Sequence, residues 1–146
     1  IKKLWPLYGD WNYAAAKIEK LGHFGTQPPY LLSAIAEAMH FNQTLGLARK
    51  EARLRHIKNY WVDRLADVPN IILPTPAEDH RSCAISLVGI RNKEPGELAK
   101  ELYERYQIFT VSPGYPGAVR ISPNIYTSIG ELDRFVAAMK ELAAAS

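Results

Sequence analysis

The sequence has little cysteine and no long apolar run. Cys83 is the single cysteine; it excludes a disulfide within the chain and favours a reducing compartment, so we expect a cytoplasmic protein. No stretch approaches the ~18 consecutive apolar residues that a membrane-spanning helix needs, and we therefore expect no membrane partner. Internal repeats and low-complexity segments are also lacking, which argues against a solenoid or a disordered linker.

The sequence lacks a strong excess of positive or negative charge. The formal net charge is +3 in 146 residues, which is too small to indicate nucleic acid or a membrane surface by itself. Hydrophobic residues make up 47% and charged residues 23%, as is typical of a globular domain with a substantial core. The chain begins Ile1-Lys2-Lys3 without an initiator methionine, so we expect it to be a piece of a longer protein.

Apolar periodicity and capping signals predict four helices. Two long helices follow one another, separated by Gly46, and the last helix starts at a capping box formed by Ser128 and Glu131. The predicted helices cover residues 29–45, 47–66 and 95–106, and the fourth begins after Ser128.

Four short strands complete the pattern, at residues 71–73, 83–90, 108–111 and 118–121. Because consecutive strands are joined by short connections, we expect an α/β (α+β) fold. It would have a small antiparallel or mixed sheet with helices on one face, preceded by the two long helices. Residues 1–28 are rich in aromatics, Gly and Pro, and we expect a loop that packs onto the rest of a larger protein.

Arg120 is the one charged residue in the predicted strand 118–121. Its guanidinium keeps its proton, so burial among apolar neighbours would require an anionic partner. That partner could be the carboxylate of a small amino-acid substrate. It could also be an internal carboxylate, for which Glu78, Asp79 and Glu104 are the candidates, and the residues by themselves leave both interpretations open.

Gly25 and Thr26 stand just before the first long helix. Gly25 permits close backbone approach, Thr26 offers a hydroxyl and an N–H group, and the N-terminus of a helix suits a phosphate. The alternative is that Thr26 and Gln27 only cap this helix.

The second long helix carries many basic residues. Two consecutive helices, the second of them basic, invite a helix-turn-helix interpretation, and residues 84–144 follow the element order of a ferredoxin-like unit. The alternative hypothesis is therefore a non-catalytic ferredoxin-like module that binds a ligand or nucleic acid. Acidic residues interrupt the basic face, however, and a solvated surface is the simpler interpretation. The basic residues are Arg49, Lys50, Arg53, Arg55, His56 and Lys58.

Two motifs resemble the class V aminotransferase family, the pyridoxal-phosphate enzymes of fold type I. The first is His23-Phe24-Gly25-Thr26 leading into a long helix. The second is Val119-Arg120-Ile121-Ser122-Pro123, followed by Tyr126-Thr127 and the helix that opens Glu131-Leu132-Asp133. The opening Lys2–Leu7 also looks like the segment that follows the cofactor lysine. The resemblance is greatest to the branch of isopenicillin-N-epimerase-like and selenocysteine-lyase-like proteins.

The resemblance implies a fold and a set of site residues. Residues 1–28 would be the tail of the large cofactor domain and a crossover segment, and residues 29–146 the C-terminal small domain. Arg120 would bind the α-carboxylate of a small amino-acid substrate. Gly25 and Thr26 would bind the phosphate of pyridoxal 5'-phosphate in the other subunit of a homodimer, and no nucleic acid would be bound.

The departures from the family pattern limit the chemistry. In this family the Schiff-base lysine precedes the segment matched by Ile1, so we expect no catalytic residue and no metal ligand here, and an inactive chain by itself. The cysteine-desulfurase branch places a nucleophilic cysteine shortly before the matching arginine, but residues 105–119 contain none. We interpret Cys83 as a buried structural thiol. Amino transfer, epimerisation and lyase chemistry stay open.

Overall fold

The computed structural model describes residues 2–4, 28–112 and 114–145. The chain divides into two compact units, residues 1–44 and residues 45–146, and each is described by itself. The expectations for residues 1–28 fall almost entirely outside the described residues.

The described part of the first unit is chiefly helix α1, Pro29–Leu45, with the predicted bounds. Its apolar side chains Leu32, Ile35 and Met39 are exposed. Near its C-terminal end, Asn42 Nδ2 donates to Ala38 O at 2.8 Å. The apolar stripe predicted from the sequence is therefore present on this helix as exposed surface.

The second unit is built around two packed helices, α2 (Leu47–Leu65) and α4 (Ile129–Ala144). Ile57, Trp61 and Leu65 of α2 are fully buried and recur every four residues, as the periodicity predicted. The Trp61 ring meets the Phe135 ring of α4 edge to face, with 5.4 Å between the ring centroids. This geometry is a favourable one for aromatic pairs, and it fixes α4 against α2.

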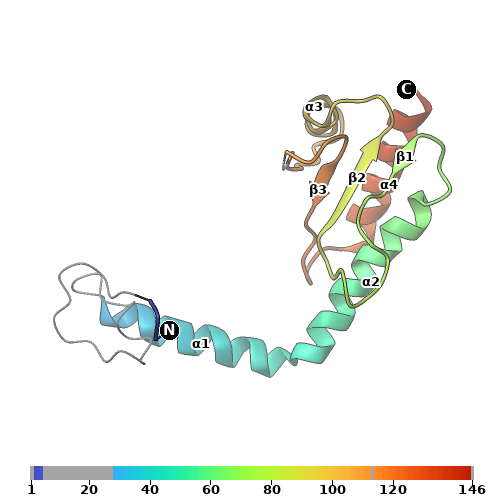
Figure 1. The fold of residues 1–146 in the computed structure, drawn as a ribbon. Helices are drawn as coiled ribbons and strands as arrows, with labels where there is room; N and C mark the ends of the chain where they lie inside the picture. The colour runs from blue at the N-terminus through green and yellow to red at the C-terminus, as the bar shows by residue number, and fades with distance from the viewer. Residues whose placement is uncertain (1, 5–27, 113, 146) are drawn as a thin grey trace. The chain divides into compact units, whose positions relative to one another are not determined.

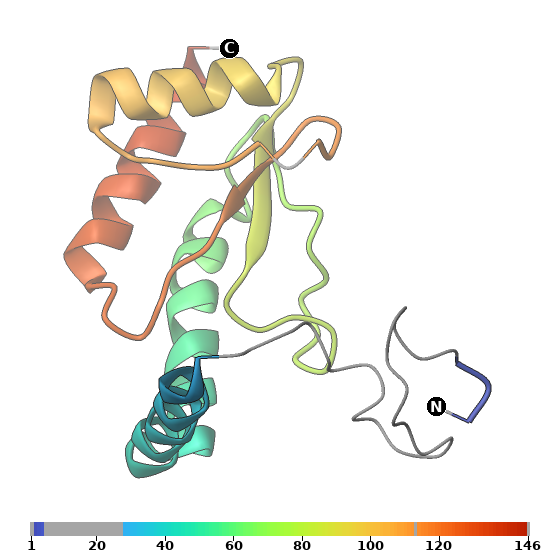
Figure 2. The same cartoon turned by 90° about the vertical axis from the view of Figure 1, so that its left-hand side faces the viewer.

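A three-stranded antiparallel sheet packs on these helices. Its strands are β1 (Ile71–Ile72), β2 (Ser86–Ile90) and β3 (Val119–Ile121), in the order β1-β2-β3. Figures 1 and 2 show α2 and α4 on the same side of this sheet, which confirms the predicted layering of helices on one face. Helix α3 (Pro95–Tyr106) lies across one end, close to β2 and β3.

The prediction of a strand at residues 108–111 is wrong. Only one antiparallel bridge forms there, between Val111 and Arg120. The cause lies at the end of α3, where Gln107 turns into the left-handed conformation and Ile108 N donates back to Leu102 O at 3.0 Å. These bonds tie the start of the segment to the helix end, in the manner of a Schellman turn, and leave little of it to pair with β3.

The remaining boundaries differ by a few residues. Strand β2 begins at Ser86 rather than at residue 83, and α2 ends at Leu65 rather than at residue 66. The capping box is confirmed, since Glu131 N donates to Ser128 Oγ and Ser128 N donates to Glu131 Oε2, at 3.2 and 2.8 Å. This box sets the start of α4, directly after the segment that leaves β3.

Candidate functional site

Arg120 is the middle residue of β3 and lies on the face of the sheet away from the helices. Val119 and Ile121 are buried, whereas Arg120 is exposed. Successive side chains in a strand point to opposite faces, so the apolar neighbours of Arg120 pack on the core without burying it. Arg120 is therefore not buried among its apolar neighbours, contrary to the expectation from the sequence. Arg120 instead stands on an open sheet surface.

The backbone of Arg120 is held on both sides. Arg120 lies opposite Leu87 of β2, and Arg120 N donates to Val111 O at 2.7 Å. These contacts fix the origin and direction of a long side chain whose end is free to meet a ligand.

No described carboxylate makes an ion pair with Arg120. Two of the three internal candidates are committed elsewhere, since Glu78 lies 3.5 Å from Arg81 and Asp79 lies 3.6 Å from Arg55. The third, Glu104, forms no ion pair within the described ranges. An internal salt bridge for Arg120 is thus not found in this part of the chain. Its guanidinium can take an external anion without first breaking an ion pair.

A close backbone contact braces the open face of the sheet. A Cβ atom added at Gly89 of β2 would lie 1.8 Å from Gly117 O, and Gly117 itself has a φ of 76°. Only glycine fits at position 89, and position 117 also favours it because L side chains rarely adopt that φ. The turn that leads into β3 is therefore seated directly on β2. Nothing in the local sequence pattern marks Gly89 for this role.

Arg53 of α2 holds the loop that follows β3. Its Nη2 donates to Thr127 O at 3.0 Å and its Nε donates to Ile125 O at 3.5 Å. Within the loop, Thr127 Oγ1 accepts from Asn124 N at 3.0 Å. Tyr126 is 82% exposed at the tip. The loop is thus fixed at its base and presents an aromatic side chain close in sequence to Arg120.

Arg55 and Lys58, near the middle of α2, also serve the fold. Arg55 pairs with Glu51 at 2.7 Å and donates to the carbonyl oxygens of Asp79 and Ser82. Lys58 is buried and donates to Ser82 Oγ at 2.8 Å. These side chains hold the loop before β2 against the helix. Because these two cations are used within the fold, fewer basic side chains of α2 are free to bind nucleic acid, which disfavours the helix-turn-helix interpretation.

Several predictions concern other residues. Gly25 and Thr26 lie outside the described residues, so their role at a phosphate stays a prediction. Cys83 is partly exposed rather than buried.

Across residues 2–4, 28–112 and 114–145, no cluster of three or more His, Cys, Asp or Glu could hold a metal ion. No helix in those ranges has both the length and the apolarity to cross a membrane.

Comparison with known proteins gives one similar curated protein. No protein-family profile matches the chain. Isopenicillin N epimerase of Streptomyces clavuligerus is 34% identical over 114 residues, which is 75% of this chain and 28% of the epimerase. The chain therefore spans less than a third of the length of that relative.

Solved structures share the fold. A NifS-like protein superposes with a TM-score of 0.69 at 21% identity, over 84% of this chain and 35% of that protein. A C-DES variant with glycine covalently linked to its PLP cofactor superposes with a TM-score of 0.60 at 14% identity, over 71% of this chain and 27% of the other. The chain thus has the fold of a part of these larger proteins.

Proposed function

Because the chain is related to the class V aminotransferase enzymes, we propose that it forms part of a pyridoxal-phosphate enzyme that acts on a small amino acid. The observation that carries the proposal is the placement of Arg120. This arginine stands on an open sheet face, with its backbone fixed by two neighbouring segments and with no ion pair to a described residue.

In this proposal Arg120 binds the substrate α-carboxylate. Its planar guanidinium can donate two parallel hydrogen bonds to the two carboxylate oxygens, which fixes the orientation of the substrate as well as its position. A lysine at the same place would act only as a point charge. Arg53 and the turn seated on Gly89 support this role, because they hold the segments that follow and precede β3.

The cofactor would supply an electron sink for the bond broken at the substrate α-carbon. The described residues fit the substrate end of such a site. Lys58 is buried against Ser82 and Lys93 pairs with Glu101 at 2.8 Å, so neither offers a free amine. We place the Schiff-base lysine in another part of the intact enzyme, and we expect this chain by itself to be inactive.

The phosphate would be bound by Gly25 and Thr26, across a homodimer. Helix α1 begins at Pro29, three residues after Thr26, and the free N–H groups and positive dipole end of a helix start favour a phosphate. We further propose a cytoplasmic enzyme, which the single cysteine suits. Amino transfer, epimerisation and lyase reactions all start at the same α-carbon, and each would use the same carboxylate anchor.

The test is Arg120→Lys in the intact enzyme. Because the fork of two hydrogen bonds is lost, we expect the half-saturating concentration of the amino-acid substrate to rise by about tenfold or more. Arg91→Lys is the matched control. Arg91 is exposed just after β2, its backbone N–H donates to Asn70 O, and its side chain makes no hydrogen bond or ion pair with a described residue. Unchanged substrate affinity in Arg120→Lys, with the Arg91 control also unchanged, would refute the assignment.

A further inference from the structure

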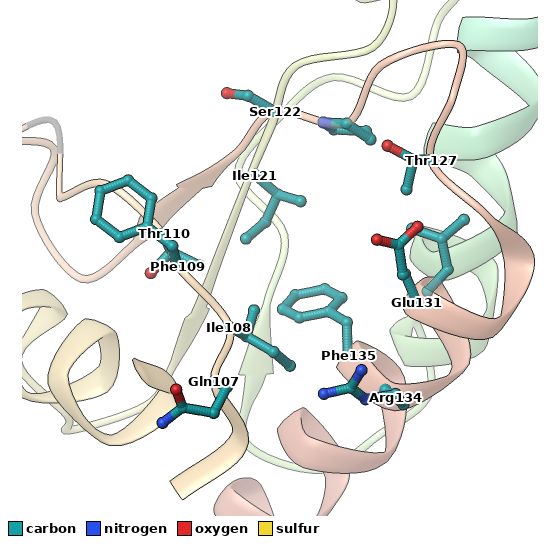
Figure 3. Close-up of a pocket in the computed structure, with 12 residues that line it drawn as sticks. Gln107, Ile108, Phe109, Thr110, Ile121, Ser122, Thr127, Glu131, Arg134 and Phe135 are labelled. Carbon is teal, nitrogen blue, oxygen red and sulfur yellow. The ribbon is translucent and has the colours of Figure 1, made fainter. Parts of the chain in front are cut away.

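A second candidate site lies on the opposite side of β3 from Arg120. It is a pocket of about 280 Å³ between the segment after α3, the end of β3 and the first turns of α4. Figure 3 shows Ile108, Ile121 and Phe135 from these three elements turned into the same space. Ile121 follows Arg120 directly, but it belongs to the buried face of β3. The pocket is therefore separate from the open sheet face.

The floor of the pocket is apolar. Ile121 and Phe135 are buried core residues, and Ile108 is packed against the same core. The volume lies just below the range of about 300–1,000 Å³ that is common for drug-sized ligands. An apolar side chain of a metabolite would cover this floor, whereas a folded partner is too large to enter.

One edge of the pocket carries a fixed negative charge. Glu131 Oε2 accepts from Ser128 N and Ser128 Oγ, both at 2.8 Å, while no described residue donates to Oε1. The hydrogen bonds from the Ser128 backbone, and then from its hydroxyl, lower the pKa of the Glu131 carboxyl. The carboxylate is thus ionised near neutral pH and held in place, with one oxygen available.

The same edge carries a positive charge one helical turn further on. Arg134 Nη2 donates to Tyr106 O at 3.3 Å, and Arg134 forms no ion pair with any described residue. Residues three apart are neighbours on a helix surface, and Figure 3 shows Glu131 and Arg134 on the α4 side of the pocket. The charge of Arg134 adds to the lowering of the Glu131 pKa, but no salt bridge joins the two side chains, which lie at the margin of an apolar floor.

We propose that this pocket binds a free apolar α-amino acid, at a site distinct from that of Arg120. The ammonium group of the ligand pairs with Glu131 Oε1, its carboxylate pairs with Arg134, and its side chain covers Ile108, Ile121 and Phe135. A zwitterion satisfies both charges at once. An internal peptide segment has neither terminal charge, and a simple carboxylic acid offers no ammonium group to Glu131 Oε1.

The experiment is an NMR titration in which L-leucine is added to the full 146-residue chain labelled with 15N. N-acetyl-L-leucine removes the ammonium group, L-leucinamide removes the carboxylate, and glycine removes the apolar side chain. Glu131→Gln and Arg134→Gln remove the two protein charges one at a time. Glutamine at position 131 can still serve the capping box, and Lys140→Gln is the control for loss of an exposed cation on the same helix.

We expect saturable shifts at the amides around Ile108, Ile121 and Glu131 with L-leucine, and binding about tenfold weaker or more for each of the three analogues. Arg134→Gln and Glu131→Gln should weaken L-leucine binding by a similar factor, whereas Lys140→Gln should not. Three results would overturn the proposal: no saturable shift, equal binding of N-acetyl-L-leucine, or shifts centred on Arg120. The analogues test both charges on the unaltered chain, so the outcome does not depend on how well a variant folds.

Discussion

Gly89→Ala is expected to unfold the second unit at a markedly lower temperature. A Cβ atom at position 89 would lie 1.8 Å from Gly117 O and 2.9 Å from Gly117 C. No van der Waals contact is that short, and the obstacle is backbone rather than a flexible side chain. Either the turn before β3 must leave β2, or the pairing of β2 with β3 must open.

The size of the effect follows from the kind of clash. Overpacking a well-packed site costs about 1–3 kcal/mol, and a rigid backbone obstacle belongs at the upper end, so we expect about 3 kcal/mol. In a unit of this size each kcal/mol lowers Tm by about 4–8 °C, which gives a fall of at least ~10 °C. Circular dichroism at 222 nm, followed during heating and in urea, measures both the Tm and the free energy of unfolding.

Gly96→Ala is the matched control. Gly96 lies in the first turn of α3, and a Cβ atom there meets nothing within 4 Å. Because alanine is the better helix former, this variant should be neutral or stabilised by up to ~1 kcal/mol. If Gly89→Ala unfolds at the same temperature as Gly96→Ala, the close seating of the turn on β2 is wrong, and so is the bracing of β3 that we infer from it.

Three further predictions concern the loop after β3 and the start of α4. Arg53→Ala should lower the free energy of unfolding in urea by about 1.5–3 kcal/mol, because two partly buried carbonyl oxygens lose a charged donor. The control Arg49→Ala, on the exposed side of the same helix, should change it by no more than ~0.5 kcal/mol. Equal losses in the two variants would contradict the anchoring role. Ser128→Ala should cost about 1 kcal/mol through loss of the cap. The pKa of Glu131 is lower in the folded chain than in the unfolded chain. Its carboxylate therefore stabilises the fold at pH values above the pKa of the unfolded state, and this contribution is lost as the pH falls through the pKa of the folded state. Tm measured from pH 7 down to pH 3 should therefore fall less in Glu131→Gln than in the unaltered chain, and identical pH profiles would show that this carboxylate contributes nothing.

The helices could be predicted because their signals are local. The bounds of α1 and α3 agree with the sequence prediction, and the capping box located the start of α4 within a few neighbouring residues. Strand pairing depends on distant partners, and there the prediction was weaker. The segment 108–111 has strand-like residues, but its start is held by the end of α3 and only Val111 reaches β3.

The same distinction applies to the candidate site. The sequence placed Arg120 in a strand, as the structure shows. The apolar neighbours suggested burial of its charge, but successive side chains in a strand point to opposite faces of the sheet, so these neighbours do not surround it. Arg53 was assigned to a solvated helix surface, yet it contacts a loop more than 70 residues further along the chain. Gly89 carries no local signal at all, since its partner is the backbone of Gly117. Contacts between distant segments had to come from the structure.

The most direct test of the central claim compares an amino-acid substrate with its carboxamide in the intact enzyme, with and without Arg120→Lys. If Arg120 binds the carboxylate, the carboxamide should bind about tenfold weaker or more in the unaltered enzyme, and the two losses should not add, because both changes remove the same interaction. Fully additive losses would contradict the account and would show that another group binds the carboxylate.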